Sequence, residues 1–430
     1  MQYVWQHRLW PHNQMQTVDG LRVQVIDPGT LNRDAGPDFF NAKIEIDSRL
    51  WVGNVEIHVR ASDWHRHHHD NDPAYDSVIL HVVDRDDTRI CRSDGQVIPQ
   101  MVMNCEPEFH VHYRNMVSRA NFDLPCVDEI RNSERLRLTD WLTALAYERL
   151  YEKSDRICGL LKHFSGDWDS AAYVTVARCL GFAINGEPFE RVALATPLNF
   201  LSKHADSLFS LEAILFGQSG LLPAPGTPGG SDPYVEELRK EYQFMAHKFG
   251  IKPPVSPGWK MSRMRPPNFP HRRIATLAAI LHRGYRLLST LINVETVKDA
   301  CTIFTPELSS YWQTHFTFSA PSPSTPRALS LTSSRLMAIN AVVPLLHAYG
   351  TTHDLAELTQ KAMDMLMELP GENNSMTEPF SQAGIKIKDA FTSQALIQLR
   401  RRYCMERKCL YCRIGHRMLS QRVKREAVAQ

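Results

Sequence analysis

Residues 36–60 read GPDFFNAKIEIDSRLWVGNVEIHVR, and this stretch predicts two neighbouring β-strands. In residues 42–46, isoleucines alternate with charged residues, which is typical of a strand with one buried face. A hairpin turn is expected near Ser48 and Arg49, and residues 51–59 continue as the second strand. The N-terminal fold is therefore expected to be built on this pair of strands.

Further strands are expected on either side of the pair. Residues 21–26 alternate in the same way, and residues 97–102 follow an Asp94-Gly95 turn. Residues 78–83 (VILHVV) are almost entirely apolar, which predicts a strand buried on both faces. The first 120 residues are therefore expected to be rich in β-structure.

Beyond about residue 130 the apolar residues recur at helical spacing. Helices are expected over 136–151, 170–184, 190–217, 232–249, 271–293, 333–349 and 353–368. The fold class is thus predicted to be α+β. Three parts are expected: a β-rich domain (1–120), a larger helical domain (121–395) and a basic, cysteine-containing tail (396–430).

The overall composition is that of a soluble globular protein, with 43% hydrophobic and 22% charged residues among 430. No apolar run reaches the roughly 18 residues of a membrane span, and the N-terminus lacks the pattern of a signal peptide. Nine cysteines, an odd number and mostly scattered, are typical of reduced thiols. A cytoplasmic protein without a membrane partner is expected.

Two carboxylates and an imidazole gather on the first two strands. Asp38 opens one strand, and Glu56 and His58, two residues apart on the next, share one face. The opposite face is expected to enter the core through Val55, Ile57 and Val59. Two carboxylates can hold Mg²⁺ or Mn²⁺, and an imidazole beside them can assist a metal-activated water. Asp38, Glu56 and His58 are therefore the candidate catalytic residues.

The pattern Pro37-Asp38, a gap of 17 residues and then Glu56-Ile57-His58 resembles the PD-(D/E)xK nuclease superfamily. The resemblance implies a restriction-endonuclease-like mixed sheet with Asp38 and Glu56 as metal ligands. His58 stands where that superfamily has a lysine, which changes the group that would activate the water. A helix is usual after the glutamate strand, and residues 61–76 leave room only for a short one.

A wider set of segments resembles one uncharacterised bacterial family, domain of unknown function 2851. The set comprises GPDF, VEIH, DWHRHHHD, LHVV, EAILFGQSGLL (212–222), RMRPPNFP (263–270) and the C-terminal cysteines. This resemblance covers nearly the whole chain and implies no particular activity.

Several neighbouring residues have alternative interpretations. Asp63, His65, His67 and Asp72 are further candidates, either as ligands or as groups that orient ligands. His81, in an apolar strand, is expected to be a hydrogen-bonded core histidine. A purely structural interpretation is also open: a turn or cap at Asp38, a solvated strand face for Glu56 and His58, and an exposed loop at 67–69.

The tail contains Cys404-x4-Cys409-x2-Cys412-x3-His416. Three thiolates and one imidazole can bind Zn²⁺ tetrahedrally. An iron–sulfur cluster usually takes four thiolates, and no fourth cysteine is near in the sequence. The alternative is a set of reduced thiols on a basic helix, next to Arg400–Arg402.

These features favour a metal-dependent phosphodiesterase, specifically a nuclease, with the helical domain and basic tail holding nucleic acid. No phosphate-binding loop of the G-x-x-x-x-G-K-[ST] type and no G-x-S-x-G elbow occurs, so the sequence gives no support for those chemistries. Two alternatives remain: a non-enzymatic nucleic-acid-binding or scaffold protein with a zinc tail, and a histidine-ligated hydrolase of small substrates.

Overall fold

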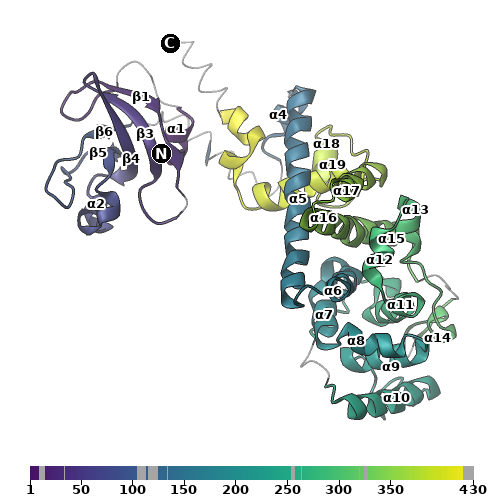
Figure 1. Cartoon of the computed structure of the whole chain (residues 1–430). Helices are drawn as coiled ribbons and strands as arrows, with labels where there is room; N and C mark the ends of the chain where they lie inside the picture. The colour runs from purple at the N-terminus through teal and green to yellow at the C-terminus, as the bar shows by residue number, and fades with distance from the viewer. Residues whose placement is uncertain are drawn as a thin grey trace. The chain divides into compact units, whose positions relative to one another are not determined.

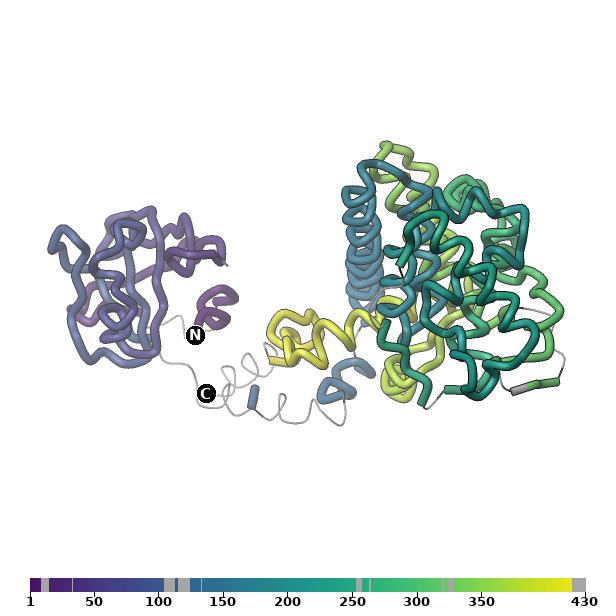
Figure 2. The backbone as a smooth tube through the Cα atoms, turned by 90° about the horizontal axis from the view of Figure 1, so that it is seen from below, coloured from purple at the N-terminus to yellow at the C-terminus, as the bar shows by residue number. Residues whose placement is uncertain are grey.

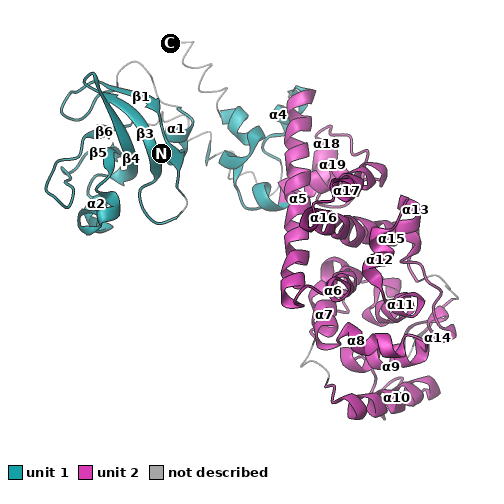
Figure 3. Cartoon of the chain, viewed as in Figure 1, with its two compact units in different colours: residues 1–134, 401–430 teal, residues 135–400 magenta. Residues whose placement is uncertain are grey.

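The computed structural model describes residues 1–8, 15–32, 34–103, 113–114, 124–132, 134–252, 257–262, 264–318, 320–323 and 328–419. The chain divides into two compact units, shown in Figure 3. Unit 1 comprises Met1–Glu134 together with Arg401–Gln430, and unit 2 comprises Arg135–Arg400. The cysteine-containing tail, which was expected to be a separate part, belongs to the same unit as the β-rich region.

Unit 1 is built on a mixed sheet in which the strands are ordered β1-β3-β4-β5-β6, with β2 pairing to β3 (Figure 1). The strands are β1 (Val23–Asp27), β2 (Thr30–Leu31), β3 (Phe39–Ile46), β4 (Arg49–Arg60), β5 (Val78–Arg85) and β6 (Gln100–Val102). The mixed sheet followed by a larger helical region confirms the predicted α+β class.

The hairpin between β3 and β4 forms where the sequence predicted it. Asp47 and Ser48 both have positive φ, 48° and 66°. Two such residues make the tight turn that matches the twist of the flanking strands. Antiparallel pairing then runs from Ile46 opposite Arg49 to Phe39 opposite Val55. This register brings the start of β3 beside the middle of β4.

The last third of β4 corrects one expectation. Val59 is 58% exposed and does not enter the core. Because β3 begins opposite Val55, the residues that follow on β4 extend past it. Both faces of β4 are buried from Val55 to His58, so simple alternation between core and solvent does not hold there.

β5 and β6 run parallel to β4 in the order β4-β5-β6. All residues of β5 from Val78 to Val83 are buried, as predicted for an apolar central strand. The crossover from β4 to β5 contains only short elements: α2 (Asp63–Arg66) and the 3₁₀ turns η1 (His69–Asn71) and η2 (Pro73–Tyr75). The expected short helix is therefore present.

Two segments distant in sequence complete the core of unit 1. The short helix α1 (Gln2–Gln6) buries Trp5, whose indole N–H donates to the Pro28 carbonyl at 3.0 Å. Leu419 from the tail belongs to the same apolar cluster as Trp5 and Phe39. The remaining labelled helix of the unit is α4 (Val127–Asn132).

Unit 2 is helical, and its longest helix, α5, runs along one side of it (Figure 2). Its α-helices are α5 (Arg135–His163), α6 (Trp168–Leu180), α7 (Phe182–Ala195), α8 (Leu198–Leu201), α9 (Leu208–Ser219), α10 (Pro233–Phe249), α11 (Pro270–Arg283), α12 (Leu287–Ile292), α13 (Val297–Thr302), α14 (Ser310–Gln313), α15 (Leu331–Met337), α16 (Val343–Thr352), α17 (Ala356–Glu368), α18 (Glu378–Gln382) and α19 (Ala390–Gln398). Shorter elements are η3 (Ser202–His204), η4 (Pro266–Asn268), the π-helices η5 (Ala338–Val342) and η6 (Leu399–Cys404), the strands β7 (His315–Thr317) and β8 (Ala320–Pro321), and η7 (Cys409–Tyr411) in the tail.

Three predicted helices are each interrupted. The 170–184 helix spans the break between α6, which ends at Leu180, and α7, which begins at Phe182. The 190–217 helix is divided among α7, α8 and α9. Pro197 accounts for the first break, because proline cannot continue a helix through its own position, and η3 lies at the second. The 271–293 helix breaks at Gly284 between α11 and α12. Within the described residues, no helix is long and apolar enough to cross a membrane.

Candidate metal centre

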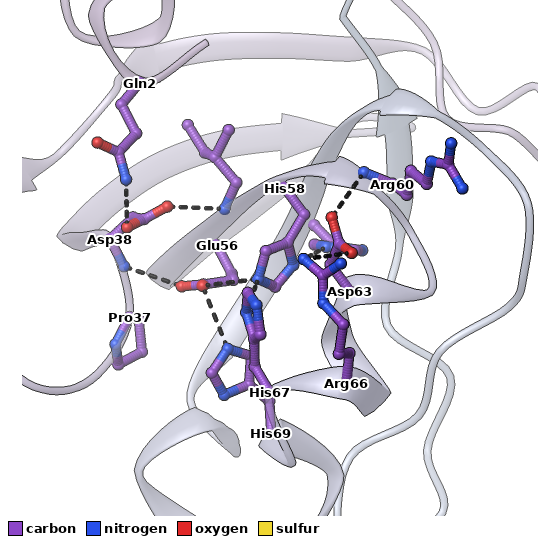
Figure 4. A network of polar contacts seen from close by, with 12 residues as sticks. Gln2, Pro37, Asp38, Glu56, His58, Arg60, Asp63, Arg66, His67 and His69 are labelled. Carbon is purple, nitrogen blue, oxygen red and sulfur yellow. Dashed lines mark hydrogen bonds and ion pairs between the residues drawn. The ribbon is translucent and has the colours of Figure 1, made fainter.

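Asp38 and Glu56 are linked through the β3–β4 pairing. The backbone N–H of Asp38 donates to Glu56 Oε2 at 3.0 Å, and the N–H of Ile57 donates to Asp38 Oδ2 at 3.1 Å. Gln2 on α1 donates to Asp38 Oδ1 at 2.6 Å (Figure 4). The structure thus brings the two predicted carboxylates together, and both oxygens of Asp38 are occupied by hydrogen-bond donors.

The second oxygen of Glu56 points toward histidines. Its Oε1 lies 3.4 Å from His58 Nε2 and 3.5 Å from His69 Nε2 (Figure 4). One ring nitrogen from each of His58, His67 and His69 lies within 4.8 Å of the other two. Glu56 and His58 are only 5% and 7% exposed, whereas His67 is at the surface. This cluster of Glu56 and three histidines is therefore buried where it meets the sheet and is exposed to solvent at His67.

The short crossover explains how three imidazoles meet. After α2, His68 adopts a left-handed conformation with φ 61°, so the chain turns sharply between His67 and His69. The ring of His69 then stacks on Tyr75 with centroids 3.7 Å apart. His69 was one of the histidines of the predicted exposed loop, and this turn directs it back to the sheet.

A buried chain of hydrogen bonds fixes the proton positions on His58. The Gln100 side-chain nitrogen donates to Asp86 and to the Thr88 carbonyl, so its oxygen accepts from His81 Nδ1 at 3.1 Å. A neutral His81 then has a bare Nε2, which accepts from His58 Nδ1 at 2.9 Å. His58 is consequently left with its Nε2 lone pair aimed at Glu56 and His67.

Burial sets the charge of the site in the absence of metal. It raises the pKa of Glu56 to about 8, and the neighbouring Asp38 charge adds to the rise. Burial and the adjacent histidines lower the pKa of His58 to about 3, while burial lowers that of His81 to about 4. Burial also raises the pKa of Asp38. Near pH 7, His58 and His81 are therefore neutral and Glu56 is protonated.

The donor set can hold a metal ion. Glu56 Oε1 supplies one oxygen, and His58, His67 and His69 supply three imidazole nitrogens. Imidazoles suit zinc, iron and similar ions, whereas Mg²⁺ prefers oxygen ligands. The set therefore fits a transition-metal ion better than the magnesium expected from two carboxylates alone.

The other candidates have structural contacts. Asp63 accepts from the Arg60 N–H at 3.2 Å and pairs with Arg66 at 2.9 Å, which secures the turn after β4. Asp72 caps η2 by accepting from the Ala74 N–H. His65 is exposed and lies 3.4 Å from Asp70.

His81 is fully buried and hydrogen-bonded, as predicted. The sequence did not predict its contact with His58 or its hydrogen bond with Gln100. A histidine in an otherwise apolar strand was the available signal, since such a ring requires polar partners.

In the predicted tail site, His416 has other contacts. Its Nδ1 lies 2.5 Å from the Tyr3 hydroxyl, and its ring centroid lies 4.4 Å from that of His7. Cys404, Cys409 and Cys412 lie in the same unit, and none of them forms a disulfide bond.

A pocket of about 350 Å³ borders the candidate centre. Its walls come from α1, from the end of β4 and from the tail: Met1, Gln2, Tyr3, Gln6, Leu31, Ile57, His58, Val59, Leu410 and Tyr411. A cavity of this size is typical of small-ligand sites.

Residues 1–375 match the model of a family described as protein of unknown function (DUF2851). The chain belongs to this family. Neither a curated protein nor a solved structure matches the chain. The likeness to the PD-(D/E)xK superfamily thus remains a resemblance in two short motifs, and membership of the DUF2851 family assigns no chemistry to the site.

Proposed function

We propose that unit 1 is a divalent-metal-dependent phosphodiesterase that acts on nucleic acid. The observation that carries the proposal is the position of Glu56 Oε1, 3.4 Å from His58 Nε2 and 3.5 Å from His69 Nε2, on a carboxylate hydrogen-bonded to the Asp38 backbone. Nucleic acid is proposed as substrate from the Asp38, Glu56 and His58 pattern and from the exposed basic residues of the tail, such as Arg401.

Each residue has a role in this proposal. Glu56, His58, His67 and His69 hold the ion, with Mn²⁺ or Zn²⁺ favoured by the imidazoles. When bound, the ion supplies an acidified water and polarises a phosphoryl oxygen. Asp38 fixes Glu56 through its backbone N–H. His81 and Gln100 keep the His58 Nε2 lone pair directed into the site. Glu56 gives up its proton when the ion binds.

The test is cleavage of end-labelled single- and double-stranded DNA and RNA by the full chain with Mn²⁺, Zn²⁺ or Mg²⁺. Wild type is expected to cleave with Mn²⁺ or Zn²⁺, and Glu56→Gln is expected to lose at least about 100-fold in rate, as for other residues that support metal-site activity. His65→Ala is the matched control, because His65 is an exposed histidine of the same crossover. Equal cleavage by wild type and Glu56→Gln refutes the proposal.

A second candidate is a histidine-ligated hydrolase of a small substrate. The pocket of about 350 Å³ beside His58 favours it, because a cavity of that size accommodates a small ligand. The same preparations should be assayed with a small chromogenic phosphodiester. Turnover of that compound without cleavage of any nucleic acid selects this candidate. Metal binding without either activity selects a non-enzymatic protein.

A further inference from the structure

Four cysteines of unit 1 come together from two segments that are far apart in the sequence. Cys126 immediately precedes α4, whereas Cys404, Cys409 and Cys412 lie in the tail. None of the four forms a disulfide bond. The charges of the three tail thiols each raise the pKa of the Cys126 thiol, after the larger effect of burial, so all three lie near it.

The backbone of the tail reverses direction between the first two of its cysteines. At the end of η6 the N–H of Lys408 donates to the Tyr403 carbonyl at 2.8 Å, and the N–H of Arg407 donates to the Cys404 carbonyl at 3.2 Å. Arg407 has φ 56°. These bonds form a Schellman motif with arginine at the left-handed position. The reversal returns Cys409 toward Cys404.

A second tight turn brings the next pair together. The N–H of Cys412 donates to the Cys409 carbonyl at 3.3 Å, which closes η7. Gly415 packs directly on this turn, because a Cβ there would lie 2.3 Å from the Cys409 carbonyl oxygen. The charge of Cys412 contributes to raising the Cys409 pKa to about 11, again after burial. The C-x2-C segment therefore forms a compact backbone loop, and the thiols of Cys409 and Cys412 interact electrostatically.

An ion pair attaches the tail to the segment that carries the fourth thiol. Arg417 Nε lies 2.9 Å from Glu129 Oε1 of α4, and both side chains are largely buried. The Ile130 N–H donates to the Cys126 carbonyl at 2.9 Å, so Cys126 is continuous with the helix that carries Glu129.

We propose that Cys126, Cys404, Cys409 and Cys412 form a four-thiolate site for a thiophilic metal centre, either one zinc ion or an iron–sulfur cluster. Both centres are held by four cysteine thiolates. The site differs from the one predicted from sequence, because Cys126 takes the place of His416, whose ring contacts Tyr3 and His7. A metal bound there would link the tail, which includes the pocket residues Leu410 and Tyr411, to the segment of unit 1 that carries Cys126 and α4.

The first test uses the wild-type full chain, purified under anaerobic conditions. Iron, zinc and acid-labile sulfide are measured per chain, and cysteine alkylation is mapped by mass spectrometry before and after chelation. The four cysteines are expected to be protected together and exposed together by the chelator. Cys91, in the same unit, should alkylate at the same rate in both states.

Substitutions assign the ligands and separate this site from the histidine centre. Cys126→Ser and Cys409→Ser should each remove the thiol-bound metal in a Glu56→Gln background, whereas His416→Ala and Cys91→Ser should retain it. Iron with sulfide and a visible absorption that bleaches on reduction identifies a cluster; colourless stoichiometric zinc identifies a mononuclear site. The proposal is overturned if Cys126 alkylates equally with and without chelator. It is also overturned if neither zinc nor iron with sulfide restores protection to the chelated protein.

Discussion

At the residue scale, Glu56 connects the fold of unit 1 to its chemistry. One carboxylate oxygen accepts from the Asp38 backbone and the other faces His58 and His69. The first contact is an ordinary consequence of strand pairing. The second places a buried acid among neutral imidazoles, which is costly when the acid is charged and no cation is present.

This cost gives a pH-dependent prediction. The pKa of Glu56 is raised to about 8 from its ordinary value of 4.5, so the folded state keeps a proton that the unfolded state has lost. The contribution of Glu56 to stability is then largest below pH 4.5 and is lost as the pH rises through 8. Glu56→Gln should therefore stabilise the metal-free protein at pH 9 by roughly 1–3 kcal/mol, with little gain at pH 5.

Urea unfolding of the two proteins in a chelator, at both pH values, measures this effect. Glu45→Gln on β3 is the control for loss of a carboxylate and should not show the same pH dependence. A Glu56→Gln protein less stable than wild type at pH 9 would show that Glu56 is charged and compensated without metal.

A second residue-scale prediction concerns the chain from Gln100 through His81 to His58. Gln100→Leu removes the acceptor for His81 Nδ1 and leaves a buried N–H without a partner, at a cost of about 1–3 kcal/mol. Affinity for Mn²⁺ or Zn²⁺ at the histidine centre should fall about 10–100-fold, because the orientation of His58 is no longer fixed. Calorimetric titration checks this, with the exposed Gln96→Leu as control. Unchanged affinity would show that Gln100 does not orient His58 for metal binding.

At the scale of elements, the turn between β3 and β4 sets the register on which the site depends. Asp47 and Ser48 both adopt positive φ, although neither is the residue type that favours it most. The double substitution Asp47→Asn with Ser48→Gly supplies the preferred pair and should raise the free energy of unfolding by about 0.5–1 kcal/mol. Chemical denaturation measures the gain, and metal affinity should not change. A loss of stability would indicate that the native side chains make contacts that outweigh the backbone preference.

At the scale of the whole molecule, the tail is a component of unit 1. Leu419 lies in the same apolar cluster as Trp5 and Phe39, and Arg417 pairs with Glu129. Deletion of residues 401–430 should therefore speed hydrogen exchange in peptides from β1 and β3, while peptides from α16 stay unchanged. Deletion of 420–430 alone is the matched control and should leave β1 and β3 protected. Equal protection in both truncated proteins would mean that the tail does not stabilise the sheet.

The sequence alone predicted the local features of this protein: the hairpin, the apolar β5, the α+β class and the proximity of Asp38, Glu56 and His58. These follow from alternation and turn chemistry, which act over a few residues. Only the tertiary structure brought His69 to Glu56, His67 and His81 to His58, Gln100 to His81, and the tail to the α4 segment that begins after Cys126. The position of His69 depends on the left-handed turn at His68. The contacts of His81 and Gln100 depend on the order of the strands β4, β5 and β6, and the position of the tail depends on its return to unit 1. The partners are therefore adjacent in space and not in sequence.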